Sequence, residues 1–149
     1  MRIALAGDAM LGRGVAEKLE ADPRALLFDS PVAEICREAD FCVLNLECCI
    51  SDRGERWADP LKPFFFRAPP VAVDVLTGLG VDCVNLANNH ALDFGNDALL
   101  DTFEHLRSAG IQWVGAGRDV DATSPRALLS RASRSRNSEA RYLHGGWPP

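Results

Sequence analysis

The chain has 149 residues, of which 47% are hydrophobic and 25% are charged. These values are typical of one globular domain with a buried core, and they exclude a disordered or fibrous chain. The formal charge of −5 is unevenly spread, because residues 1–121 hold 11 basic and 20 acidic side chains while residues 122–149 hold five arginines and one acid. An acidic body lacks the basic face that non-specific nucleic-acid binding needs, so we expect no nucleic-acid partner.

Apolar runs and cysteine spacing indicate the compartment. No run approaches the roughly 20 apolar residues of a membrane span, and the apolar stretch after Met1 meets an acid at Asp8, too early for a signal-peptide core. The five cysteines are odd in number and show no C-x-x-C spacing. We therefore expect a soluble, cytoplasmic protein with reduced thiols and no direct membrane insertion.

Four apolar runs predict strands over residues 2–7, 41–47, 81–87 and 111–115. Helical composition and end signals predict helices over residues 14–21, 30–39, 69–79 and 95–109. Ser30 is the expected N-cap of the second helix, with Pro31 at its first position. The alternation predicts an α/β fold, a β-α-β-α-β-α-β unit with a mostly parallel sheet. The nearly continuous apolar run 41–47 predicts a strand covered on both faces.

Two segments depart from this alternation. Residues 51–63 are polar and contain proline, which predicts a loop, with a short extended piece over the three phenylalanines 64–66. After Asp121 the hydrophobic periodicity stops. We therefore predict a domain over residues 1–124, and over 125–149 a basic Arg/Ser-rich tail that is disordered or non-homologous.

Polar side chains able to bind a metal follow the ends of the first three predicted strands. They are Asp8, then Asn45 and Glu47, then Asn88, Asn89 and His90. Ligands of open parallel sheets bind outside the carboxyl ends of the strands, so these side chains are expected to converge. Carboxylates, an amide oxygen and an imidazole suit manganese, iron, zinc or magnesium.

Each of these residues also has a simpler interpretation. Asp8 alone is consistent with a helix or turn cap, Glu47 with a solvated strand end, and the asparagines with turn positions. His90 alone is consistent with a core histidine bonded to a backbone carbonyl. Four such coincidences at equivalent strand ends are harder to accept than one, which favours a shared site.

Four motifs in order connect the chain with a known family. They are Gly-Asp-Ala-Met-Leu-Gly-Arg at 7–13, Asn-Leu-Glu at 45–47, Leu-Ala-Asn-Asn-His-Ala-Leu-Asp-Phe-Gly at 86–95, and Gly-Ala-Gly-Arg at 115–118. Together they resemble the poly-gamma-glutamate capsule-synthesis (CapA-type) family, which is similar to the calcineurin-like metallophosphatases. The resemblance covers roughly residues 1–125.

The resemblance implies a role for each candidate residue. Asp8, Glu47 and Asn89 would bind metal, with two divalent ions in a full-length relative. His90 and Arg13 would be catalytic, His90 by stabilising charge on a bound phosphate or carboxyl group. Weaker substrate-binding candidates are Asn45, Asn88, Asp93 and Arg118. The expected partner is an anionic small molecule or polymer.

Two departures from the metallophosphatase pattern leave the function open. Met10 stands where ordinary metallophosphatases have a histidine, and the histidine ligands of their second half have no counterpart here. The resemblance then implies the N-terminal half of a four-layer sandwich, with an uncovered sheet that could self-associate. One hypothesis is a capsule-biosynthesis protein that hydrolyses a phosphoester or similar anionic substrate with metal. The alternative is a truncated, inactive remnant of such a domain.

Overall fold

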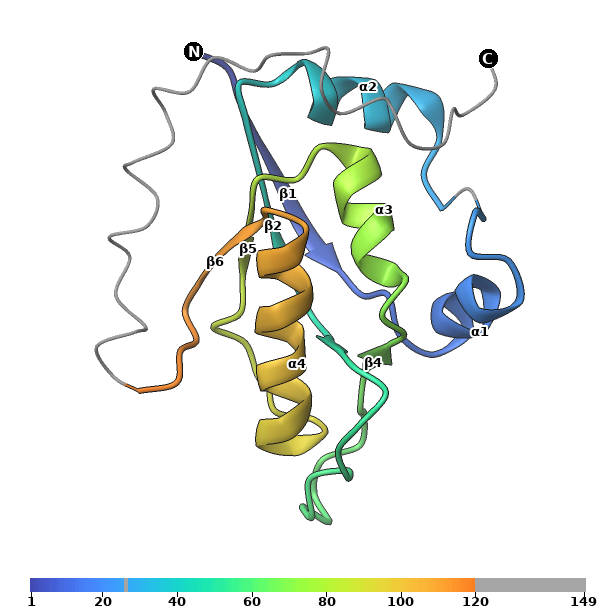
Figure 1. Cartoon of the computed structure of the whole chain (residues 1–149), viewed down its shortest axis with the longest axis vertical. Helices are drawn as coiled ribbons and strands as arrows, with labels where there is room; N and C mark the ends of the chain where they lie inside the picture. The colour runs from blue at the N-terminus through green and yellow to red at the C-terminus, as the bar shows by residue number, and fades with distance from the viewer. Residues whose placement is uncertain (26, 120–149) are drawn as a thin grey trace.

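A computed structural model of the chain describes residues 1–25 and 27–119 (Figure 1). The elements in chain order are β1 (Ile3–Ala9), α1 (Gly14–Ala21), α2 (Ser30–Glu38), β2 (Phe41–Leu46), β3 (Cys49–Ile50), β4 (Arg67–Ala68), α3 (Ala72–Leu79), β5 (Cys83–Asn85), α4 (Gly95–Ser108) and β6 (Gln112–Val114).

The main sheet has four strands in the order β1-β2-β5-β6, and every neighbouring pair is parallel. Parallel neighbours need crossover connections, and helices supply them between these strands. This arrangement confirms the predicted α/β fold with a mostly parallel sheet. It also places the carboxyl ends of all four strands at one edge.

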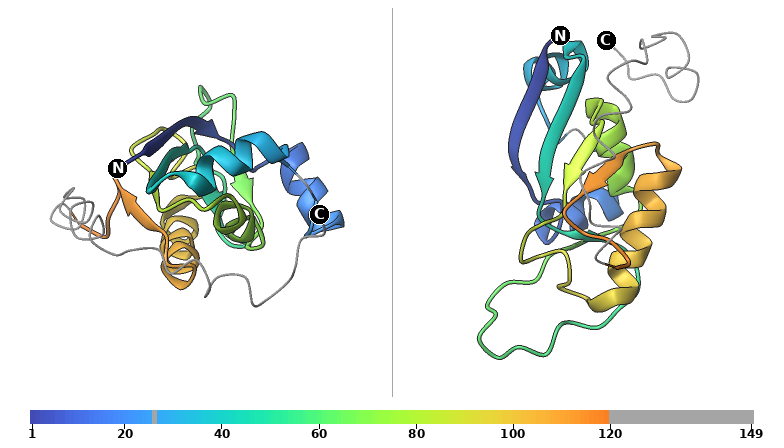
Figure 2. Two further views of the ribbon diagram at one scale, coloured as in Figure 1. Left: turned by 90° about the horizontal axis from the view of Figure 1, so that it is seen from above. Right: turned by 90° about the vertical axis from the view of Figure 1, so that its left-hand side faces the viewer.

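Two short strands were not predicted. Cys49 pairs with Arg67 and Ile50 with Ala68, which makes a second, two-stranded parallel sheet. Strands of two residues carry no readable alternation, so the sequence pattern could not reveal them. They bracket residues 51–66, which extend as a long excursion beyond the carboxyl ends of the main strands (Figure 2).

The start of α2 also differs from the prediction. Asp29, rather than Ser30, is the N-cap, and its Oδ1 accepts a hydrogen bond from the backbone N–H of Val32 at 3.4 Å. Pro31 still lies in the first turn, where its missing N–H costs no helical hydrogen bond. The helix signal was correct and its boundary was one residue out.

The core lies between the main sheet and the helices. The largest fully buried apolar side chains include residues of three helices and three strands, namely Leu19, Leu46, Ile50, Leu76, Val84, Phe103 and Leu106. Burial of each large side chain contributes about 2 kcal/mol. The Phe103 ring of α4 also stacks on Trp113 of β6, with centroids 4.9 Å apart. This contact fixes the longest helix against the sheet edge.

The sheet is covered unequally on its two faces. Along β2 buried residues alternate with half-buried ones, whereas burial on both sides was predicted for this run. On β1, Ile3 and Leu5 are 51% and 80% exposed. Figure 2 shows why: the described helices lie on one side of the sheet. The prediction of cover on both faces was therefore wrong for the described part of the chain.

Among the described residues, no helix has the length and apolar character needed to cross a membrane. The predicted domain boundary at residue 124 and the basic segment 125–149 lie outside the described residues, so both stay predictions.

Candidate metal and substrate site

A β-bulge brings Asp8 into line with the polar residues of the next strands. Leu5 pairs with Val43, but Asp8 pairs with Asn45, so β1 uses one more residue than β2 over this stretch. An extra residue reverses the face to which the following side chains point. Asp8 thereby shares a row with Asn45, and Asn45 pairs in turn with Asn85 of β5.

The side-chain amide of Asn45 joins this row into one cluster. Its Nδ2 donates to Asp8 Oδ1 at 2.9 Å and to Glu47 Oε1 at 3.2 Å. Its Oδ1 accepts from Asn85 Nδ2 at 2.8 Å and from Asn88 Nδ2 at 3.1 Å. An amide whose two N–H donors and two acceptor sites are all hydrogen-bonded is held in one orientation. The two carboxylates therefore meet at a fixed point at the ends of β1 and β2.

Asn88 connects this cluster to His90. Its Nδ2 also donates to the carbonyl oxygen of Leu46 at 2.9 Å, and its Oδ1 accepts from the backbone N–H of His90 at 3.0 Å. This side-chain bond to the backbone two residues on is an Asx turn, which Asn favours. The turn after β5 is thus anchored to the end of β2, and this turn holds the backbone of His90.

His90 is buried and bonded through both ring nitrogens. Nδ1 lies 2.7 Å from Oδ2 of the fully buried Asp93, and Nε2 lies 3.2 Å from Asn89 Nδ2. A carboxylate beside Nδ1 holds the imidazole ring in one orientation, with Nε2 on the side of Asn89. The ring also packs on Phe66, with centroids 4.2 Å apart. Asp93 therefore orients His90 rather than facing a ligand itself.

Lys62 completes the surroundings of Asp93. Its Nζ lies 2.8 Å from Asp93 Oδ1 and donates to the carbonyl oxygen of Asn89 at 2.6 Å. The backbone N–H of Phe66 donates to Asp93 Oδ2 at 2.6 Å. The excursion over residues 51–66 is in this way bonded directly to the turn that carries Asn89 and His90.

The glycine turn predicted after the fourth strand closes the edge of the cluster. Gly115 has φ +84°, and a Cβ there would lie 2.5 Å from Ala87 Cβ and 2.9 Å from Asn85 Oδ1. A side chain would collide with the strand end that carries Asn85, so glycine is required here.

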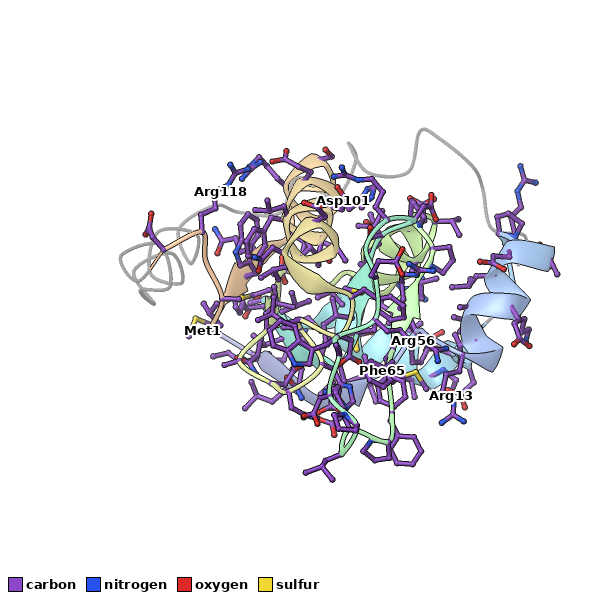
Figure 3. The ribbon with its side chains drawn as sticks, turned by 90° about the horizontal axis from the view of Figure 1, so that it is seen from below. Met1, Arg13, Arg56, Phe65, Asp101 and Arg118 are labelled. Carbon is purple, nitrogen blue, oxygen red and sulfur yellow. The ribbon has the colours of Figure 1, made fainter. Side chains whose placement is uncertain are left out.

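Within the described part of the chain, neither arginine candidate takes part in the hydrogen bonds of this cluster. Arg118 forms an exposed ion pair with Glu104 of α4 at 3.2 Å. Arg13 precedes α1, and its guanidinium lies 5.6 Å from the ring centroid of Phe64. Figure 3 shows Arg13 and Arg118 on opposite sides of the molecule. The structure brings together the other seven candidates: Asp8, Asn45, Glu47, Asn88, Asn89, His90 and Asp93.

Three residues of the site were missed from sequence. Asn85 could have been found, since it lies in a predicted strand at the same position as Asn45. Lys62 and Phe66 carried no such signal, because a loop has no register that relates it to the sheet.

The donor set suits a hard divalent cation. Two carboxylates share one amide, and the Asn89 amide is joined to them through His90 and Asn88. Oxygen-rich donors of this kind favour magnesium, manganese and similar ions. Within residues 1–25 and 27–119, no three His, Cys, Asp or Glu side chains gather as a ligand group. Burial raises the pKa of the neighbouring Cys48 thiol to about 12, which favours a packing role for it.

A parallel sheet with polar residues at its carboxyl edge is typical of α/β proteins whose ligands bind at the strand ends. Comparison with known proteins identifies the family. The family described as bacterial capsule synthesis protein PGA_cap matches residues 2–136, so the chain belongs to this family. The matched range includes the first part of the basic segment.

Curated relatives match over part of their length. A probable polyglutamine synthesis accessory protein of Mycobacterium tuberculosis is 47% identical over 91 residues, which are 61% of this chain and 23% of the relative. The PGA biosynthesis protein CapA of Bacillus subtilis is 30% identical over 112 residues, 74% of this chain and 29% of that protein. The capsule biosynthesis protein CapA of Bacillus anthracis is 26% identical over 121 residues, 80% of this chain and 29% of that protein. The chain spans less than a third of the length of these relatives.

Proposed function

We propose that this capsule-synthesis family member supplies a divalent-metal site for hydrolysis of a phosphoester or similar anionic substrate. The observation that carries the proposal is the Asn45 amide that joins the Asp8 and Glu47 carboxylates at the strand ends. The CapA names of the relatives support capsule-polymer synthesis as the setting.

The residues divide into metal ligands and residues that position them. Asp8, Glu47 and Asn89 would bind the metal through oxygen, and Asn45 holds the two carboxylates at one point. A bound divalent ion would polarise the substrate oxygen and make a bound water a nucleophile near neutral pH.

His90 would stabilise charge on the substrate. Asp93 fixes its ring, and the Phe66 ring covers one side, so Nε2 is held at a defined place in a sheltered environment. A hydrogen-bonding group fixed before the substrate binds pays no cost of reorganisation during the reaction.

Metal binding and turnover test the proposal together. The purified chain is loaded with Mn²⁺, bound metal is measured by elemental analysis, and turnover is measured with bis-p-nitrophenyl phosphate. We expect Asp8→Asn and Glu47→Gln to lose metal and turnover together. His90→Gln should keep the metal and lower the turnover rate about a hundredfold.

Glu20→Gln is the matched control, because it removes an exposed carboxylate of α1 that takes no part in the hydrogen bonds of the cluster. It should leave both measurements unchanged. A folded chain that binds no metal and shows no turnover would contradict the hydrolase and support the alternative, an inactive domain. Equal turnover in wild type and Asp8→Asn would also contradict it.

A further inference from the structure

Lys62 is a nearly buried cation to which the proposed function gives no role. Its side chain is 15% exposed, and its Nζ lies 2.8 Å from Asp93 Oδ1. The same nitrogen lies 5.8 Å from the ring centroid of Phe65, so an aromatic ring flanks the ammonium as well. Because lysine is rarely removed from water without a partner for its charge, its contacts at this position show what it holds in place.

The local sequence fixes the backbone of Lys62. The chain turns over residues 59–62, where the N–H of Lys62 donates to the carbonyl oxygen of Asp59 at 3.2 Å. Asp59 Oδ1 also accepts from the N–H of Leu61 at 2.8 Å. Aspartate at the first position of a turn and proline at the second, here Pro60, are typical of a type I turn. Lys62 therefore extends from a turn with a defined shape.

Two backbone hydrogen bonds tie the excursion over residues 51–66 to Asp93, one on each side of this turn. The N–H of Trp57 donates to the carbonyl oxygen of Asp93 at 2.9 Å, and the N–H of Phe66 donates to Asp93 Oδ2 at 2.6 Å. The turn that carries Lys62 is thus held beside Asp93 from both directions along the chain.

Lys62 closes a ring of four contacts that includes two residues of the candidate site. Its Nζ donates to the carbonyl oxygen of Asn89 at 2.6 Å and also contacts Asp93 Oδ1. Asp93 Oδ2 lies 2.7 Å from His90 Nδ1, and His90 Nε2 lies 3.2 Å from Asn89 Nδ2. Neutralising Asp93 needs only one of the two bonds that Lys62 makes. The bond to the Asn89 carbonyl adds a direct link to the backbone of a proposed metal ligand.

We infer that Lys62 is a positioning residue of the candidate site, which fixes the Asn89 amide and the His90 ring relative to each other. The inference rests on the proposed function, in which Asn89 binds the metal through its amide oxygen and His90 faces the substrate. An ammonium has three donors and no acceptor, so it can hold a carbonyl oxygen and a carboxylate at once. Loss of a group that orients metal ligands from outside typically lowers metal affinity or activity tenfold to a hundredfold.

The Mn²⁺ affinity of the full chain tests the inference, measured from the electron paramagnetic resonance of unbound Mn²⁺. Lys62→Met removes the ammonium and keeps a flexible side chain of similar length. We expect it to weaken Mn²⁺ binding about tenfold to a hundredfold. Lys62→Arg keeps the charge and the N–H donors, and it should keep the affinity within about threefold of wild type.

Leu79→Ala is the control for a general loss of stability. Leu79 is buried at the end of α3 that leads into β5, so it lies at the sheet edge opposite the site. Its truncation leaves a cavity, which should lower the unfolding temperature without changing the Mn²⁺ affinity. Equal affinity in wild type and Lys62→Met would overturn the inference, and so would an equal loss in Lys62→Met and Leu79→Ala.

Hydrogen exchange of the metal-free chain tests Lys62 separately from the proposed function. The backbone N–H of His90 is bonded to Asn88 Oδ1 at 3.0 Å, and that of Asp93 to the His90 carbonyl oxygen at 3.3 Å. We expect both to exchange about tenfold faster in Lys62→Met than in Leu79→Ala, because the turn opens locally.

The two measurements separate the two proposals. Faster exchange in Lys62→Met supports the positioning role even if wild type binds no Mn²⁺, a result that would contradict the proposed metal site alone. Mn²⁺ binding by wild type, with affinity and exchange unchanged in Lys62→Met, would support the metal site and overturn the role of Lys62.

Discussion

The amide of Asn45 holds the carboxylates of Asp8 and Glu47 at one edge of the sheet, and it can do so because of a one-residue bulge in β1. Its place at a strand end, two positions before Glu47, correctly predicted that both lie at one edge of the sheet. Its connecting role was not predictable, because it depends on a bulge in β1 that aligns Asp8 with it. Sequence patterns locate strands, but a one-residue irregularity inside a strand decides which side chains share a face.

Lys62 gives a prediction at the scale of one residue. Its ammonium is the cationic partner of the fully buried Asp93, and Lys62 is itself only 15% exposed. Lys62→Met would leave the Asp93 charge buried with only His90 and one backbone N–H. We expect the free energy of unfolding to fall by about 3 kcal/mol, measured by urea denaturation with tryptophan fluorescence.

Two further variants separate this buried pair from a general effect of charge. Lys18→Met changes an exposed lysine of α1 and should shift stability by less than about 0.5 kcal/mol. Adding Asp93→Asn to Lys62→Met should recover part of the loss, because the buried charge is then gone. An equal effect of the Lys62 and Lys18 changes would show that the pair contributes little.

At the scale of elements, the long periodic segments were predictable and the short ones were not. The helix over 95–109 was found almost to its ends as α4, because fourteen residues repeat one buried face. β3 and β4 were missed, since each has two residues and is defined only by its partner. The excursion between them brings Lys62 and Phe66 to His90, so the missed elements are those that complete the site.

The link between this excursion and α4 predicts that the stability of the fold depends on pH. Asp101 of α4 accepts from Ser51 Oγ at 2.6 Å and from Arg53 Nε at 3.0 Å, just where the excursion begins. The hydrogen bonds from Arg53 lower the pKa of Asp101 from 3.8 to about 2. The carboxylate is thus favoured in the folded state, so its contribution is complete above about pH 4 and is lost as the pH falls toward 2.

Urea denaturation at several pH values between 2 and 5 measures this dependence. Asp101→Asn should lower stability at pH 5 and flatten its change between pH 4 and pH 2. Asp52→Asn, an exposed acid of the same segment, should keep the wild-type pH profile. A profile for Asp101→Asn as steep as that of wild type would assign the acid sensitivity to other carboxylates.

At the scale of the whole molecule, the sheet carries its described helices on one side, and β1 is an edge strand with Ile3 and Leu5 exposed. An exposed edge with unpaired backbone groups and large apolar side chains favours pairing with a second chain. We therefore expect the 149-residue chain to self-associate through β1, with sedimentation velocity showing a concentration-dependent dimer or larger species. Leu5→Lys should shift the chain toward monomer, because a charge at the edge opposes association.

Leu61→Lys is the matched control, because it makes the same change at an exposed leucine of the excursion. This leucine is 88% exposed, and its substitution should leave the distribution of species unaltered. Loss of association in both variants would point to non-specific charge repulsion, and a wild-type chain that stays monomeric at high concentration would contradict the role of the edge.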